Sequence, residues 1–225
     1  MQADFNRPVL AVDTGTSYLS LALRADGETH LFHQKAGSRQ SELILPEIRT
    51  LFRNAGITAA DLGAIVYAKG PGAFTGLRIG IGVAQGLATP FDTPLIGIPS
   101  LDAAASMPPP QSCILAAADA RMGEVFYAWF DTLNRRRLSD YQVGRAADIT
   151  LPEGHVFSDG IGNAFALENR PPFTGKPEMP TAADFLNLAE EGGFPAVAAA
   201  HAELLYVRNK IALTVKEQAE RKART

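Results

Sequence analysis

Cysteine is almost absent from this 225-residue chain, in which Cys113 is the only one. One cysteine excludes a disulfide framework or a cysteine-based zinc site within one chain and is typical of a reducing compartment. Long apolar runs are also missing, because the charge-free run 79–91 is too short to span a bilayer and the run 103–118 contains three prolines at 108–110. The first residues, MQADFNRPVL, lack the apolar core of a signal peptide. We therefore expect a cytoplasmic protein that does not bind membranes.

An excess of positive charge is missing too. The net charge is −3 and the isoelectric point about 5.8, whereas a protein that holds nucleic acid by itself needs a concentrated basic surface. The only basic clusters are residues 135–137 and 208–224. Such runs usually lie on solvent-exposed faces of a protein. Contact with a nucleic acid is therefore expected only within a larger assembly. The hydrophobic content of 46% is ordinary for one large globular domain or two small ones.

The chain has few histidines and none of the usual catalytic spacings. The four are His30, His33, His155 and His201, with no His-Glu-x-x-His motif and no Ser-His-Asp pattern. His30 and His33 are three apart on a predicted strand, so they point to opposite faces and cannot share a metal there. A metal site or a catalytic triad is not expected.

The N-terminal half alternates strand and helix patterns. We expect a meander of three strands at 8–14, 17–26 and 28–35, with a turn at Asp26-Gly27. A helix over 40–54 should end at Gly56, with Pro46 beginning or kinking it. A strand at 64–68, a glycine-rich helix at 76–88 capped by Thr75, and a strand at 94–98 follow.

A near-repeat indicates two lobes. VLAVDTGTSYLSLAL at 9–23 is echoed by CILAAADARMGEVFYAWF at 113–130, which places Asp13 and Asp119 at matching positions. Such self-similarity, with a proline-rich stretch between the copies, is typical of duplication. The second copy is eroded: strands are expected near 138–143 and 155–158, and helices at 181–191 and 209–224.

The stretch KGPGAFTGLRIGIGVAQGLA at 69–88 contains four helical glycines, Gly76, Gly80, Gly82 and Gly86. Each is less favourable in a helix than alanine by about 1 kcal/mol, so they need a compensating gain. The loop could hold a phosphate, but the Gly-Lys-Ser/Thr ending of a Walker loop is missing. Glycines four apart also allow close approach of a second helix or backbone, either within the fold or from another protein.

Two turns carry groups suited to chemistry. In phosphate-binding hairpins shaped like Asp13-Thr14-Gly15-Thr16, the glycine admits the phosphate, the threonine adds a hydroxyl and the carboxylate holds the metal. Around the second turn, Asp119, Arg121 and Glu124 could serve a site in the cleft. In each case the plain alternative is an ordinary turn, in the second case with the arginine neutralised by its neighbours.

Several motifs together resemble the TsaB (YeaZ) family. They are AVDTGTSYLSLALR at 11–24, the glycine stretch 69–88, PLIGIPSL at 94–101, AADARMGEVFYA at 117–128 and YVRN at 206–209. The resemblance implies the α/β actin/Hsp70-like (ASKHA) fold of two ribonuclease H-like lobes with mixed sheets. It divides the chain into an N-terminal lobe 1–106, a reduced C-terminal lobe 107–204 and a C-terminal helix 205–225 that packs back on the first lobe.

The resemblance also implies a function. TsaB proteins are partners of TsaD, with TsaE, in transferring the threonylcarbamoyl group from threonylcarbamoyl-AMP to N6 of the tRNA adenosine 3′ of the anticodon. Where TsaD carries its His-x-x-x-His metal ligands, this chain has Ser100 and Ala104, neither of which holds a metal as imidazole does. A non-catalytic subunit without a metal or a required cofactor is therefore expected.

Nucleotide binding is expected to be weak at most. Asp13, Gly15 and Thr16 would form a vestigial site for ATP or ADP. Where TsaD has a second, glycine-rich phosphate loop and an Asp-Asn pair, this chain has residues 159–163 and, roughly aligned, Thr181-Ala182. The family also tends to carry a histidine where this chain has Gln40.

By resemblance, helices 40–54 and 76–88 form the contact with TsaD, and a homodimer is expected when the chain is alone. tRNA would be met only within the complex. The expected contact residues are Leu43, Gly72, Phe74, Thr75, Gly76, Arg78, Gly80, Gly82 and Gly86. On this interpretation a Gly80→Leu variant folds but loses its partner.

Two alternatives stay open. An ATP-dependent phosphotransferase of the same fold would use Asp13, Gly15 and Thr16, and tight magnesium-dependent ATP binding with turnover would favour it. A metallopeptidase is suggested only by an old label of the family, and no ligand set in the sequence supports it.

Overall fold

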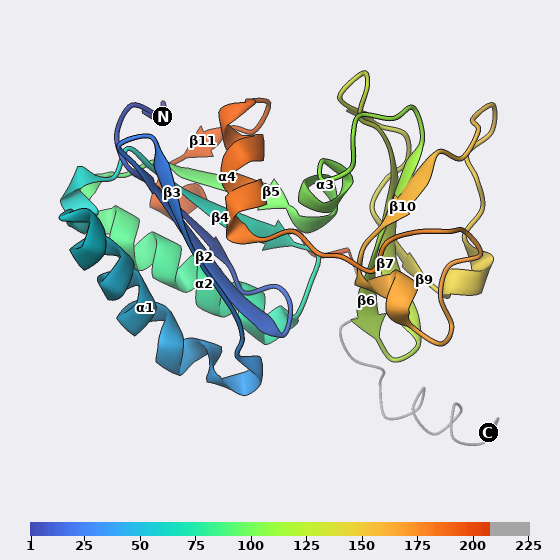
Figure 1. Cartoon of the computed structure of the whole chain (residues 1–225), viewed down its shortest axis with the longest axis horizontal. Coiled ribbons are helices and arrows are strands. Elements are labelled where there is room, and N and C mark those ends of the chain that lie inside the picture. The colour runs from blue at the N-terminus through green and yellow to red at the C-terminus, as the bar shows by residue number, and fades with distance from the viewer. Residues whose placement is uncertain (208–225) are drawn as a thin grey trace.

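Two lobes lie side by side in the computed structural model, which describes residues 1–207 (Figure 1). The first is built on a six-stranded sheet and the second on a five-stranded one. The near-repeat in the sequence therefore does correspond to two separate sheets.

The first sheet has the strand order β11-β5-β4-β1-β2-β3. Its strands are β1 (Val9–Asp13), β2 (Tyr18–Ala25), β3 (Glu28–Lys35), β4 (Ala64–Gly70), β5 (Leu95–Pro99) and β11 (Ala196–Val197). β1, β2 and β3 form the predicted antiparallel meander, whose turn at Asp26 and Gly27 has positive φ angles of 51° and 79°. β4 and β5 run parallel to β1, so the carboxyl ends of these three strands meet at one edge of the sheet.

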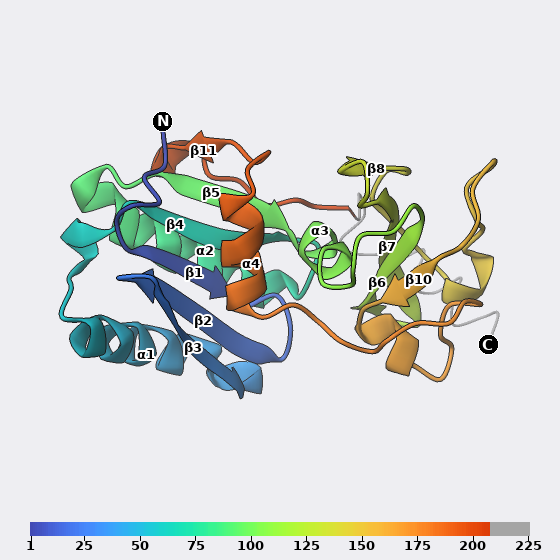
Figure 2. The ribbon, with the colours of Figure 1, turned by 45° about the horizontal axis from the view of Figure 1, so that its top comes forward.

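Helices cover both faces of this sheet. α1 (Gln40–Ala55) and α2 (Phe74–Ala88) pack on one face, where Leu10, Leu21 and Ile44 belong to one buried cluster. α4 (Ala182–Glu190) packs on the other, with Phe185 buried against Val9. Figure 2 shows the sheet between these two layers. Burial on both faces explains why β1 and β4 are almost continuously apolar.

One of the two local predictions at the helices was wrong. α1 starts at Gln40 and continues through Pro46, so of the two roles expected for the proline it does not begin the helix, and α1 ends as expected at Gly56 in the left-handed conformation. α2 begins at Phe74, one residue before Thr75, and its N-cap is Ala73 without a side-chain hydrogen bond. Thr75 therefore lies within the first turn and does not cap it.

The second lobe repeats the start of the first. Its strands are β6 (Ile114–Arg121), β7 (Glu124–Asp131), β8 (Arg136–Arg137), β9 (Gln142–Gly144) and β10 (Asp159–Ile161). β6 pairs with β7 antiparallel and with β10 parallel, as β1 does with β2 and β4. The strands expected near 138–143 and 155–158 occur a few residues later, as β9 and β10.

The chain returns to the first lobe earlier than predicted, so the boundary of the second lobe at residue 204 was wrong. β11 pairs with β5, and α4 is held on β2, where Ala182 N donates to the buried Ser20 Oγ at 2.8 Å. Arg24 of β2 donates to Asn187 Oδ1 at 2.7 Å and pairs with Glu190. Further on, Leu205 N donates to the carbonyl of Lys69 at 2.8 Å. The expected helix 209–224 lies outside the described residues.

α3 (Ser100–Ala105) joins the two lobes. It follows β5 directly, and Leu101, Ala104 and Ala105 are buried against β6 and β7 of the second sheet. The Tyr141 hydroxyl donates to Asp102 Oδ2 at 2.5 Å, which adds a polar link between the lobes. The first residue of α3, Ser100, is thereby placed where the lobes meet.

Candidate functional site

A cavity of about 510 Å³ lies between the lobes. From the first lobe it is lined by the β1–β2 turn, the loop before α2 and the start of α3. From the second lobe it is lined by the end of β6 and the segment after β10. The first lobe thus contributes the carboxyl ends of β1, β4 and β5, where sheets of this kind bind their ligands.

Asp13 is the last residue of β1 and lies at the floor of this cavity with only 4% of its surface exposed. Its Oδ1 accepts a hydrogen bond from Gly15 N at 2.7 Å. Burial raises the pKa of the carboxyl to about 6, although the bond from Gly15 opposes the shift. Within the described residues, no basic side chain pairs with Asp13. The carboxylate is therefore buried without a cation.

The predicted phosphate hairpin uses several of its polar groups internally. Gly15 N is bonded to Asp13, Gly15 O accepts from Ala73 N at 2.8 Å, and Thr16 Oγ1 accepts from Tyr18 N at 3.1 Å. The loop before α2 lies so close that a Cβ on Gly72 would be 2.6 Å from Gly15 O. Gly72 is therefore explained by packing on this turn. Weak nucleotide binding at Asp13, Gly15 and Thr16 stays a prediction.

Asp119 occupies the place in the second lobe that Asp13 has in the first. Its Oδ1 accepts from Arg121 N at 2.7 Å, matching the bond from Gly15 N to Asp13. The Arg121 guanidinium lies 3.3 Å from Asp119 Oδ2 with 76% of its side chain exposed, as expected of a turn that neutralises its own arginine. Asp119 and Arg121 line the cavity, whereas Glu124 is not among its lining residues.

The stretch that aligned roughly with a second phosphate loop is shaped by packing. Gly162 has a φ of 123°, and a Cβ there would lie 2.0 Å from Ala117 O. A Cβ on Gly160 would lie 2.4 Å from Thr174 O and 2.5 Å from Phe165 Cζ. Asn163 accepts a hydrogen bond from Asp119 N at 2.8 Å through its Oδ1. These contacts hold the segment against β6.

Ser100 is a cavity residue that sequence reasoning noted only as a missing metal ligand. It is 4% exposed, and its Oγ has no hydrogen-bond partner among the described residues. Its position directly after β5 was the available signal, because ligand-binding groups gather at the carboxyl ends of adjacent parallel strands. Across residues 1–207, no three histidine, cysteine or acidic side chains gather where they could hold a metal ion.

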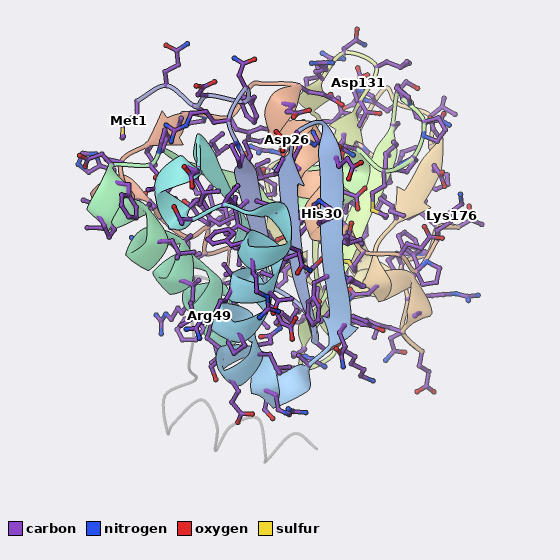
Figure 3. All side chains as sticks on the ribbon, turned by 60° about the vertical axis from the view of Figure 1, so that its left-hand side comes forward. Met1, Asp26, His30, Arg49, Asp131 and Lys176 are labelled. Atoms are coloured by element: carbon purple, nitrogen blue, oxygen red, sulfur yellow. The ribbon has the colours of Figure 1, made fainter. Side chains whose placement is uncertain are left out.

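A second candidate surface is the outer face of α1 and α2, which lie side by side on the first sheet (Figure 3). Two of the four glycines of α2 do not belong to it. A Cβ on Gly76 would lie 2.0 Å from the Thr14 carbonyl oxygen, and one on Gly80 would lie 2.4 Å from Thr14 Oγ1. Both are buried inside the lobe. The interpretation of Gly76 and Gly80 as contact residues of this face was therefore wrong. The close approach of Thr14 Oγ1 to position 80 disfavours folding of Gly80→Leu, which stays a prediction to be measured.

Gly82 and Gly86 belong to the outer face. Both are exposed, and a Cβ at either would meet nothing within 4 Å. They continue a stripe that begins at Arg78, whose guanidinium lies 3.6 Å from the ring centroid of Phe74. On α1, Leu45 is 51% exposed, while Leu43 is half-buried against the core beneath. Nothing within the described lobe explains why residues 82 and 86 are glycine.

Gln40 connects this face to the cavity floor. The side chain is buried, and its Nε2 donates to Thr16 O at 2.9 Å and to Tyr18 O at 2.8 Å. It therefore holds the start of α1 against the β1–β2 turn.

No helix in the described part of the chain is long and apolar enough to cross a membrane.

Comparison with known proteins gives relatives over most of the chain. A family model described as "TsaD: tRNA N6-adenosine threonylcarbamoyltransferase" matches residues 33–214. The tRNA threonylcarbamoyladenosine biosynthesis protein TsaB of Escherichia coli (strain K12) is 33% identical, over 91% of this chain and 96% of that protein. TsaB of Haemophilus influenzae is 38% identical over 55% of this chain and 53% of that protein.

Among solved structures, YeaZ from Pseudomonas aeruginosa superposes with a TM-score of 0.78 at 29% identity. The match covers 88% of this chain and 99% of that chain. The predicted α/β fold of two ribonuclease H-like lobes with mixed sheets, the ASKHA fold, is thereby confirmed.

We predict that Asp13→Asn stabilises the protein at pH 8. Since the folded-state pKa of about 6 lies above the ordinary aspartate pKa of 3.8, the folded state binds more protons between these values. Wild-type stability therefore falls as the pH rises through that window, by up to about 3 kcal/mol from this group. Urea unfolding from pH 4 to 8 measures it, with the exposed Asp26→Asn as control. A difference between variant and wild type that does not change with pH would contradict the assignment.

We predict opposite effects of alanine at the inner and outer glycines of α2. Gly76→Ala should lower the free energy of unfolding by about 1–3 kcal/mol or more, because its Cβ meets the Thr14 carbonyl. Gly82→Ala and Gly86→Ala should raise it by up to about 1 kcal/mol each, since alanine is the better helix former. Urea denaturation of the three single variants tests this, and equal destabilisation by all three would rule it out.

Proposed function

This chain belongs to the TsaB family, and on that premise we propose that it is a non-catalytic partner of TsaD in tRNA threonylcarbamoyladenosine biosynthesis. TsaB relatives are named for that pathway. The proposed reaction transfers a threonylcarbamoyl group from threonylcarbamoyl-AMP to N6 of the tRNA adenosine 3′ of the anticodon, with TsaE joining the pair. The contribution of this chain is a surface that binds the active state of TsaD.

The observation that carries the proposal is the pair of outer glycines. Gly82 and Gly86 each weaken α2 by about 1 kcal/mol relative to alanine, with no close contact inside the described lobe in return. Their spacing of four leaves a strip without side chains along the exposed face of the helix. A helix of another protein can approach closely along such a strip, which would supply the compensating gain.

The surroundings of the strip suit a protein partner. Half-buried aliphatic side chains, Ile79 and Val83, flank it on α2, and α1 carries an exposed leucine, Leu45. Arg49, Arg53 and Arg78 are exposed on the same two helices, so the partner face is expected to carry acidic groups. When the chain is alone, the same surface is proposed to pair with a second copy.

The absence of catalysis is proposed from the side chains themselves. By resemblance, Ser100 and Ala104 stand where TsaD has its two metal-ligating histidines, and both lie on α3 in this chain. A hydroxyl and a methyl group cannot replace two imidazoles as ligands. With a net charge of −3, contact with tRNA is proposed only within the complex.

The test is the affinity for TsaD from the same organism, measured by light scattering after size exclusion and by calorimetry. Gly82→Leu should weaken the complex at least tenfold, about 1.4 kcal/mol, because leucine fills the strip. Since the position is an exposed helical site, circular dichroism should show the variant folded.

The matched control is Ala147→Leu, which adds the same side chain to an exposed alanine of the second lobe. It should bind TsaD as the wild type does. Unchanged affinity in both Gly82→Leu and Gly86→Leu would refute the proposed surface. If wild type and TsaD form no complex under any nucleotide condition, the partner role fails and ATP turnover becomes the next measurement.

A further inference from the structure

The last described residues lead the chain along the first lobe to the inter-lobe cavity. Glu203 N donates to the Tyr67 hydroxyl at 3.1 Å, and that hydroxyl donates to the Glu203 carbonyl at 3.0 Å. Leu205 N donates to the Lys69 carbonyl at 2.8 Å. These bonds fix the path of the chain up to Val207, which itself lines the cavity.

Large apolar side chains from both lobes contribute to the cavity wall. They are Phe74, Leu77, Phe126, Leu167, Met179 and Phe185. The volume of about 510 Å³ lies within the range of small-molecule sites. Transfer of aliphatic side chains from water to such walls is favourable.

The charged groups in the cavity wall are two acids and one base. They are Asp13, Asp119 and Arg121. The Arg121 guanidinium lies 3.3 Å from Asp119 Oδ2, which leaves Asp13 without a basic neighbour among residues 1–207. The wall therefore has an acidic excess, and an occupant with basic groups complements it.

The sequence that follows Val207 combines these two properties. It begins RNKIALTV, residues 208–215, and is the first part of the 18 residues that lie outside the described structure. Two basic residues, Arg208 and Lys210, come first, and the apolar stretch 211–215 follows them. Basic and apolar side chains thus directly follow the point where the chain reaches the cavity.

The apolar stretch starts within reach of the cavity walls. A chain spans at most about 3.6 Å per residue, so Ile211 can reach up to about 14 Å from Val207. This is enough to enter a cavity of about 510 Å³ from a residue of its own wall. Closing so short a loop also costs less entropy than bringing in a distant segment.

We propose that residues 208–215 occupy the inter-lobe cavity, with Ile211 and Leu213 against its apolar walls and Arg208 and Lys210 toward its acidic groups. The gain comes from burial of the two aliphatic side chains and from charge complementarity. A small molecule that enters the cavity has to displace this segment, so the chain controls access to its own cavity. The proposal does not depend on the partnership with TsaD.

Disulfide trapping in the full-length chain tests where the segment lies. Ala212→Cys is combined in turn with Leu167→Cys in the cavity wall, with Leu45→Cys on the outer face of α1, and with Val156→Cys, an exposed site of the second lobe. The native Cys113 is buried and stays in every variant. Under one oxidant, the disulfide within one chain should form at least roughly tenfold faster with Leu167→Cys, because docking raises the local concentration of the two thiols.

Tryptic cleavage after Lys216 is a second measurement, and it needs no added cysteine. Docking of the preceding residues should protect this bond in the wild type, since cleavage requires release of the segment. Ile211→Asp with Leu213→Asp should speed cleavage at least roughly tenfold, because carboxylates are excluded from apolar walls. Ala219→Asp with Ala223→Asp adds the same charges beyond the proposed segment and should change the rate little.

Three results would overturn the proposal. One is trapping at equal rates with Leu167→Cys, Leu45→Cys and Val156→Cys. Another is faster trapping with Leu45→Cys, or disulfides mainly between two chains, which would assign the segment to the outer face of the first lobe or to a second copy. The third is wild-type cleavage as fast as that of the double aspartate variant at 211 and 213, and this comparison decides if Leu167→Cys does not fold.

Discussion

The close packing of the β1–β2 turn against the first turn of α2 is the constraint on which the cavity floor and the orientation of α1 and α2 depend. Thr14 Oγ1 donates to the carbonyl of Gly76 at 2.7 Å, and only glycine leaves room for Thr14 at positions 76 and 80. Gln40 ties the same turn to α1. One junction therefore fixes the cavity floor at Asp13 and Gly15 and also fixes how α1 and α2 face the solvent.

The glycines on the inner and outer faces of α2 have different physical explanations. Its inner glycines are required by steric contact with Thr14, so their helical penalty is offset by packing within the lobe. Its outer glycines have no such contact, and their penalty is offset only if another molecule approaches. Because contacts with Thr14 hold α2 from inside, the proposed partner would meet the outer strip in a fixed orientation, which would lower the entropy lost on binding.

The sequence predicted the parts of the fold that local periodicity and self-similarity determine. The strands of the first meander, α1 with its end at Gly56, and the duplicated hairpin with Asp13 and Asp119 were all confirmed. The return of α4 and β11 to the first lobe was missed, because chain order does not reveal which sheet a late segment joins. Spacing alone could not separate Gly76 and Gly80 from Gly82 and Gly86, since it does not show which side of a helix faces the core. The place of Ser100 in the cavity wall was missed, because the residue was considered only as a possible metal ligand.

The central claim is that the outer face of α1 and α2 is the partner surface, and hydrogen–deuterium exchange of the wild-type chain tests it most directly. Deuterium uptake is measured for the chain alone and with TsaD. The account predicts slower uptake in peptides covering 41–55 and 77–90, with the β6–β7 hairpin at 114–131 unchanged. Slower uptake confined to that hairpin and the cavity walls, with α1 and α2 unaffected, would contradict it.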